Sequence, residues 1–133
     1  MDILNNSPTY SPSHYQKLTS YLSPIEELKG YLVKREDLFQ LGISKGGKVR
    51  QCLSIVHRNL HKIKTQYNGG LITGCGLPSP QSTIVSSVAN YFGLECIVVS
   101  PRYDNSKVDV NRINVSLSQK LGARIYGVGN RNP

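Results

Sequence analysis

The chain has 133 residues, 38% of them hydrophobic, and a formal net charge of +8. This length can bury one modest core. Because no apolar run approaches the length of a membrane span, the sequence excludes a protein held by a membrane-crossing helix. The first residues show no basic stretch followed by an apolar core, so we expect a cytoplasmic protein without a secretory signal.

Residues 1–22 are polar and rich in Ser, Pro and Asn, and they predict a flexible or surface-draped arm. Residues 23–28, SPIEEL, have the pattern of a helix start, with a serine cap, a proline and carboxylates in the first turn. We expect only a short turn there. The apolar run at 31–34 then predicts a strand.

The rest of the chain alternates short apolar runs with longer helical patterns. Helices are predicted over 48–63, 80–92 and 108–121. Strands are predicted over 71–73, 95–100 and 124–128, with a loop at 101–107. This alternation predicts an α/β fold, a parallel sheet with flanking helices and right-handed crossovers. Ligand contacts are then expected at the carboxyl ends of the strands.

Cysteines and histidines give no sign of a metal site or a disulfide framework. Cys52, Cys75 and Cys96 are widely spaced and form no CxxC pair, which favours reduced thiols. His57 and His61 lie four residues apart, but no third ligand accompanies them. We therefore expect no bound metal.

A glycine turn places one lysine, Lys48, at the start of the first long helix. Lysine forms Schiff bases with carbonyl groups, and it does so best when burial or a neighbouring cation lowers its pKa. Arg35 and Arg50 are candidates for that cation, and Gly46-Gly47 removes side chains that would crowd a ligand. The pattern suits a covalently held aldehyde cofactor, with a solvated turn as the alternative.

A second block, from Gly69 to Gln81, has the pattern of a short strand closed by glycines and followed by a helix start. Ser79 is placed to cap that helix, and Pro80 suits its first position. Backbone N–H groups at such an end favour an anion or an oxyanion. An ordinary capped helix in an α/β domain is the alternative interpretation.

Together the two blocks resemble the tryptophan-synthase-β-like (fold type II) pyridoxal-phosphate enzymes. The resemblance rests on VKREDL followed by GGKVR, and on the triplet SPQ at 79–81. The branch that it resembles most holds aminocyclopropane-carboxylate deaminase and D-cysteine desulfhydrase. It implies a partial fold type II architecture, pyridoxal 5'-phosphate as the cofactor, a small amino acid as the substrate, and a lyase or deaminase reaction.

The resemblance also implies the roles of individual residues. Lys48 would bind the cofactor as a Schiff base and later move a proton, and Gly47 would lie beside the cofactor. Ser79 would act near the reacting carbon of the substrate, and Gln81 would contact the substrate carboxylate or the ring. Gly47 stands where the family commonly has Asn. Pro80 replaces the Asn of a Ser-Asn-His or Ser-Asn-Gln triplet, and it has no side-chain amide for the ring hydroxyl of the cofactor.

The resemblance covers about Leu22 to Val128 and matches only the front part of a family member. It implies an arm at 1–22, a segment of the cofactor-binding large domain at 23–50, and a small α/β domain at 51–133. The phosphate loop of the family and its partner for the pyridine nitrogen have no counterpart here. We therefore expect a fragment or one subunit, completed by a second chain or as a homodimer.

Two other classes of function stay open. The first is a degenerate fragment without catalysis, which Pro80 and the missing phosphate loop favour. The second is a basic nucleic-acid-associated module, because the segment from Lys45 to Lys64 contains basic residues and no acidic ones. No nucleic-acid-binding motif and no interleaved aromatic residues accompany that segment, which disfavours the second class.

Overall fold

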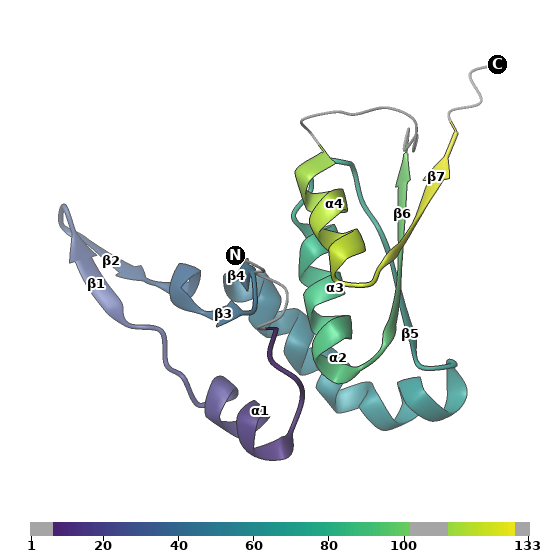
Figure 1. Cartoon of the computed structure of the whole chain (residues 1–133). Coiled ribbons are helices and arrows are strands. Elements are labelled where there is room, and N and C mark those ends of the chain that lie inside the picture. Colours follow the sequence, from purple (N-terminus) through teal and green to yellow (C-terminus); the bar gives the residue numbers. More distant parts are fainter. Residues whose placement is uncertain (1–6, 102–111, 130–133) are drawn as a thin grey trace.

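The computed structural model describes residues 7–101 and 112–129 (Figure 1). The N-terminal half holds α1 (Pro12–Thr19), the strands β1 (Ile25–Leu28) and β2 (Tyr31–Lys34), the short helix η1 (Glu36–Leu38), and the strands β3 (Gln40–Leu41) and β4 (Ser44–Lys45). The C-terminal half holds α2 (Gly47–Gln66), β5 (Gly70–Gly74), α3 (Gln81–Phe92), β6 (Glu95–Pro101), α4 (Ile113–Lys120) and β7 (Arg124–Val128).

The strands β5, β6 and β7 form a parallel sheet in that order, which confirms the α/β class and the parallel sheet. Ile72 pairs with Ile97, which pairs in turn with Arg124. Neighbouring parallel strands need a crossover connection. The helix α3 lies on the connection from β5 to β6, and α4 lies on the connection from β6 to β7.

The helix α3 occupies the centre of this half, where it contacts α2, α4, β5 and β6. Small side chains let these neighbours approach closely: Ser82 and Ser86 are fully buried, and Ser86 Oγ donates to the Ser82 carbonyl at 2.7 Å. Gly93 ends the helix with φ 65° in the left-handed region, which is common for a glycine C-cap. The helix therefore joins the sheet on one side to α2 on the other.

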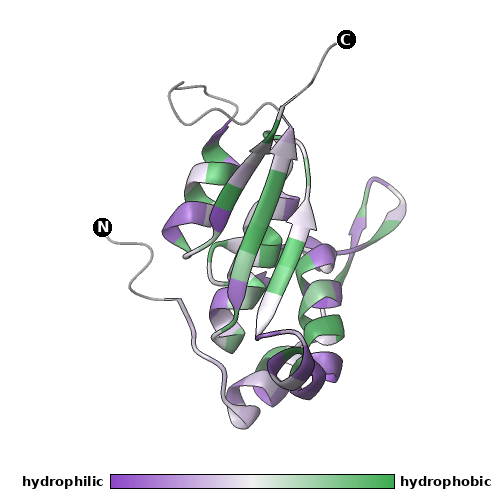
Figure 2. Ribbon diagram, turned by 90° about the vertical axis from the view of Figure 1, so that its right-hand side faces the viewer, coloured by the Kyte–Doolittle hydropathy of each residue, from purple (hydrophilic) through white to green (hydrophobic). Residues whose placement is uncertain are grey.

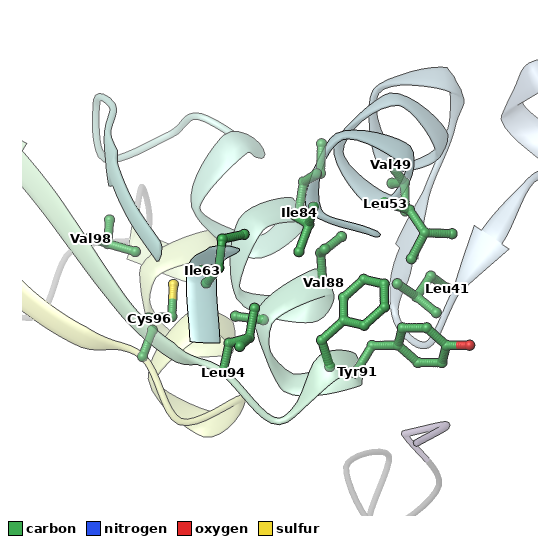
Figure 3. Packing of buried hydrophobic residues seen from close by; sticks show 14 of the residues in the cluster. Leu41, Val49, Leu53, Ile63, Ile84, Val88, Tyr91, Leu94, Cys96 and Val98 are labelled. Carbon is green, nitrogen blue, oxygen red and sulfur yellow. The ribbon is translucent and has the colours of Figure 1, made fainter. Parts of the chain in front are cut away.

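The hydrophobic core lies where α2, α3 and the sheet meet (Figure 3). Val49 and Leu53 point inward from α2, as their helical spacing predicts, and Val56 is buried one turn further on. Val88 of α3 and Val98 of β6 belong to the same buried cluster and are fully buried. Burying one such side chain contributes roughly 1.5–3 kcal/mol, so this cluster holds the layers together.

Helices pack on one face of the parallel sheet, and the opposite face is open in the described part of the chain (Figure 2). Ile72 is 71% exposed there, and Tyr126 is 52% exposed. Parallel sheets are commonly covered on both faces. The open face is therefore an apolar surface that the described part of the chain leaves in contact with solvent.

Part of the segment predicted to be a flexible arm is an anchored helix. Tyr15 of α1 stacks on His57 of α2, with ring centroids 3.7 Å apart. His14 Nδ1 lies 2.9 Å from the hydroxyl of Tyr91. Of the two predicted forms, a flexible or a surface-draped arm, α1 therefore has the second, because its aromatic contacts fix it on the core.

The helix start predicted over 23–28 is wrong, because the structure has β1 there, paired antiparallel with β2. Lys29 and Gly30 have positive φ angles of 51° and 83°, which the two-residue type I′ hairpin turn requires. The strand predicted at 31–34 is confirmed as β2. We call residues 25–34 the hairpin arm, and Figure 1 shows that it projects from the rest of the molecule.

The helix α2 runs without interruption from Gly47 to Gln66. The predicted boundary between a segment at 23–50 and a domain at 51–133 therefore falls inside a helix. In the described part of the chain, no helix is both long and apolar enough to cross a membrane.

Some predictions fall partly outside the described residues. They are residues 1–6 of the arm, most of the loop at 101–107, and the start of the helix at 108–121. The helix α4, which begins at Ile113, is the described part of that last element. The remaining predicted helices and strands of the C-terminal half are present, with ends shifted by a few residues.

Candidate functional site

A cavity of about 290 Å³ lies between the start of α2 and the start of α3. It brings together Lys48, Ser79 and Gln81, which the sequence analysis singled out. The other lining residues are Gln51, Cys52, Ile55, Pro80, Ile84 and Val85. Three of the predicted site residues therefore share one cavity, although they come from different elements.

Lys48 reaches this cavity from the first turn of α2. Residues spaced three and four apart lie on the same face of a helix. Gln51, Cys52 and Ile55 follow Lys48 at these spacings, and together they form one wall. Gln51 is not among the site residues predicted from the sequence, although its spacing of three residues from Lys48 places it on the same helix face. Lys48 itself is exposed, so its amine is accessible to a ligand.

Ser79 and Gln81 reach the cavity from the turn between β5 and α3. The Ser79 N–H donates to the Gly76 carbonyl at 3.0 Å, which closes the turn. Ser79 Oγ accepts the Gln81 N–H at 3.2 Å, so it caps the helix as predicted, although Pro80 occupies the formal cap position. Gln81 Nε2 donates to Thr73 Oγ1 at 2.7 Å. This bond ties the side chain to the carboxyl end of β5, where ligand contacts were expected.

Gly47, the fourth predicted site residue, is not among the residues that line the cavity. A Cβ atom added to it would lie 3.7 Å from the Cβ of Glu36, an ordinary contact. Gly46 has φ 103°, a conformation that favours glycine. The two glycines therefore serve the turn that leads into α2, and Gly46 provides its positive φ angle.

Arg35 and Arg50, the predicted cations beside Lys48, are both paired with carboxylates. Arg35 binds the two oxygens of Asp37 at 2.9 and 2.8 Å. Arg50 Nε lies 3.1 Å from Glu36 Oε2, and its guanidinium lies 4.1 Å from the centroid of the Phe39 ring. These contacts give no support to the prediction that either arginine assists Lys48.

Glu36 is the centre of an ion-pair cluster at the base of the hairpin arm. Lys34 Nζ lies 2.8 Å from its Oε1. The hydrogen bond from Lys34 is the main reason why the pKa of Glu36 falls to about 2, against a desolvation effect, with Ser23 and Arg50 lowering it further. Glu36 is therefore ionised at neutral pH and links β2 to α2.

The thiols near the cavity are weak nucleophiles. Burial, with a smaller effect from Cys96, raises the pKa of Cys52 to about 11. Burial is also the main cause that raises the pKa values of Cys75 and Cys96. All three cysteines are free, as predicted, and such thiols stay protonated at neutral pH. Lys48 is the residue of this cavity whose amine can form a Schiff base with a carbonyl group.

The polar groups of the cavity suit an organic ligand. They are an amine, two amides and a hydroxyl, which pair with carbonyl, carboxylate and ring hydroxyl groups. Across residues 7–101 and 112–129, no group of three or more His, Cys, Asp or Glu side chains is placed to hold a metal ion.

No protein-family model matches this chain, and no curated protein matches it either. The cavity, its side chains and the sequence pattern that points to them therefore carry the functional argument. The chemistry that they support is nucleophilic attack by a lysine on a carbonyl group, next to a helix start that favours an anion.

Proposed function

We propose that this chain is the front part, or one subunit, of a pyridoxal-phosphate-dependent lyase or deaminase that acts on a small amino acid. One observation carries the proposal. Lys48, Ser79 and Gln81, which the resemblance to fold type II enzymes selects, line one cavity. A chance match in sequence gives no reason for these residues to meet.

The cavity fits the reactive end of the cofactor. Lys48 offers a primary amine for its aldehyde, and Ile84 and Val85 offer apolar walls for its ring. The dipole at the start of α3 favours an anionic group. At about 290 Å³ the cavity lies at the lower limit of small-molecule sites, which span about 300–1,000 Å³. This size agrees with a site that a second chain or a second copy completes.

The side chains have distinct roles in this proposal. When bound, the cofactor supplies an electron sink for the charge that develops on the substrate carbon. The Lys48 amine holds the cofactor aldehyde and moves a proton. Ser79 Oγ, fixed by its turn, orients the reacting carbon. The Gln81 amide donates to Thr73 Oγ1 at 2.7 Å and to the Gly74 carbonyl at 3.4 Å. In this proposal the N–H of the longer bond turns from the Gly74 carbonyl to the substrate carboxylate.

The test is a labelling experiment with pyridoxal phosphate, borohydride reduction and peptide mass mapping. We expect a stoichiometric adduct on Lys48 that is lost in Lys48→Ala. Lys45→Ala is the matched control, because Lys45 is exposed on β4 just before Lys48 and does not line the cavity. The adduct should persist in that control.

Substoichiometric labelling spread over several lysines would overturn the proposal and favour a degenerate fragment without catalysis. Unspecific labelling together with a salt-dependent shift on DNA or RNA, absent for unrelated polyanions, would favour the nucleic-acid-associated module.

A further inference from the structure

The hairpin arm presents large apolar side chains to solvent. Leu32 is 80% exposed, Tyr31 is 74% exposed, and Ile25 is 67% exposed. A hairpin of two strands is at best marginally stable in water by itself. In the described part of the chain, β1 and β2 pair only with each other. The arm therefore has the composition of an interface and an edge on each side where another strand can add.

The hydrogen bonds of the arm show which backbone groups face away from it. The Arg35 N–H donates to the Pro24 carbonyl at 2.9 Å. Hydrogen-bonded and non-hydrogen-bonded pairs alternate along an antiparallel ladder. Pro24–Arg35 is thus a hydrogen-bonded pair, and so is every second pair after it, which makes Glu27–Leu32, three positions along, a non-hydrogen-bonded pair. Its N–H and C=O groups therefore point outward, those of Leu32 from the edge of β2 and those of Glu27 from the edge of β1.

The same alternation makes Ile25–Lys34 a non-hydrogen-bonded pair. The free edge of β2 thus offers the backbone groups of Leu32 and Lys34, and the free edge of β1 offers those of Ile25 and Glu27. Each edge has two donors and two acceptors that can bind a further strand.

We propose that β2 pairs antiparallel with β2 of a second copy of this chain across a two-fold axis, which gives a four-stranded sheet. One register uses every outward backbone group of β2. In it, Leu32 of each copy faces Lys34 of the other, and Val33 faces Val33 on the axis. Such an interface is isologous and closed, so it gives a dimer rather than a filament.

Charge selects the edge of β2 over the edge of β1. The equivalent register for β1 would place Glu26 directly opposite Glu26 of the second copy, and like charges in opposed positions destabilise a sheet. In the β2 register, Leu32 faces Lys34 and no like charges oppose each other. Glu26 and Glu27 then lie on the outer strands of the dimer, where charged side chains prevent further strand addition.

The arm is also the place where two copies can meet despite their overall charge. The chain carries a net charge of +8, so two copies repel each other in general. In the arm, two glutamates (Glu26 and Glu27) balance two lysines (Lys29 and Lys34), which leaves a net charge of zero. The arm projects away from the basic helix α2, so contact through β2 keeps the two basic helices apart (Figure 1).

The first test uses a matched pair of proline variants and sedimentation velocity of the full chain from micromolar to near-millimolar concentration. We expect a concentration-dependent dimer for the unmodified chain. Leu32→Pro removes one of the two outward N–H groups of β2 and should weaken the dimer by at least about tenfold, because the two-fold symmetry removes this hydrogen bond in both copies. Glu27→Pro removes one of the two outward N–H groups of the β1 edge and should leave the dimer intact. A monomer at all concentrations, or equal effects of the two variants, would overturn the proposal.

The second test does not depend on how the arm tolerates proline. Val33→Cys places a thiol on the two-fold axis, where the Cα atoms of opposed non-hydrogen-bonded residues lie about 4.5 Å apart, a separation that a disulfide spans. We expect mild oxidation to give a dimer linked through residue 33, identified by peptide mapping. Glu26→Cys, on the opposite strand of the same pair, is the control and should remain unlinked. Equal linkage of both variants, or none, would contradict the proposed register.

Discussion

The hairpin arm and the helical body, by which we mean α2, α3, α4 and the sheet β5–β7, use similar aliphatic residues in opposite surroundings. In the body, Leu53 and Val88 are fully buried. In the arm, Leu28 is 61% exposed and Leu32 is 80% exposed. An aliphatic side chain stabilises a fold only when folding removes it from water. The body therefore supplies the stability, and the arm is a surface that the body holds in place.

The connection between these two regions is polar. Glu36 pairs with Lys34 at the end of the arm and with Arg50 of α2. Arg50 also donates to the Tyr21 carbonyl and to Ser23 Oγ, both at 3.0 Å. These contacts orient the arm without burying it. The difference in burial can be tested by matched substitutions on the two sides.

The largest expected effect comes from removing a core side chain of the body. Leu53→Ala should lower the free energy of unfolding by about 2–5 kcal/mol, because it leaves a cavity between α2 and α3. Leu28→Ala makes the same chemical change in the arm and should cost less than about 0.5 kcal/mol. Urea denaturation followed by circular dichroism measures both. Similar losses of unfolding free energy in the two variants would mean that Leu28 is buried in solution, and the contrast between arm and body would be wrong.

The body was predictable from the sequence because burial there has a regular period. Val49, Leu53 and Val56 recur at helical spacing, and with Ile63 they are the buried residues of α2. The arm was predicted only in part. The local pattern at 23–28 favours a helix start, but the segment forms β1 because a partner strand and the turn at Lys29 are available. Such nonlocal pairing leaves little trace in a short segment.

The candidate site, like the arm, was predictable from the sequence only in part. Lys48, Ser79 and Gln81 were found because lysine chemistry, helix capping and the resemblance all pointed to them. The proposed role of the arginines found no support, since Glu36 and Asp37 follow Arg35 directly and compete for both guanidiniums. Sequence patterns show which charges are present, but only the folded chain shows which of them pair.

A smaller loss of stability is expected from replacing two glycines that have the same left-handed backbone conformation in different surroundings. Gly93 at the end of α3 and Gly30 in the arm have φ angles of 65° and 83°, and a Cβ atom would meet no neighbour at either position. Gly93→Ala should lower the free energy of unfolding by about 1–2 kcal/mol, the cost of a left-handed residue with a side chain. Gly30→Ala carries the same strain, but the arm can open locally to release it. Its effect on global unfolding should be smaller.

Hydrogen exchange separates these two outcomes. Gly93→Ala should increase exchange throughout the body, whereas Gly30→Ala should increase exchange only in β1 and β2. Faster exchange across the body in Gly30→Ala would show that the arm folds together with the body.

The smallest expected effect is a pH-dependent change in melting temperature when Glu36, which connects the arm to α2, is replaced. The pKa of Glu36 is about 2 in the folded chain, against an ordinary value of 4.5. A lowered pKa stabilises the fold above the ordinary value, and this stabilisation is lost as the pH falls from about 4.5 to about 2. The melting temperature of Glu36→Gln should therefore lie slightly below that of the unmodified chain at pH 7, and the difference should vanish near pH 2.

The control is Glu27→Gln, since Glu27 makes no ion pair in the part of the chain that the structure describes and should change the melting temperature little at any pH. Asp37, whose pKa is lowered mainly by its hydrogen bond with Arg35, is present in every variant, so its acid dependence cancels in the comparison. The effect is expected to be small because partly exposed ion pairs contribute little. A difference between Glu36→Gln and the unmodified chain that persists at pH 2 would mean that Glu36 acts through packing, and the connection between arm and body would then not be electrostatic.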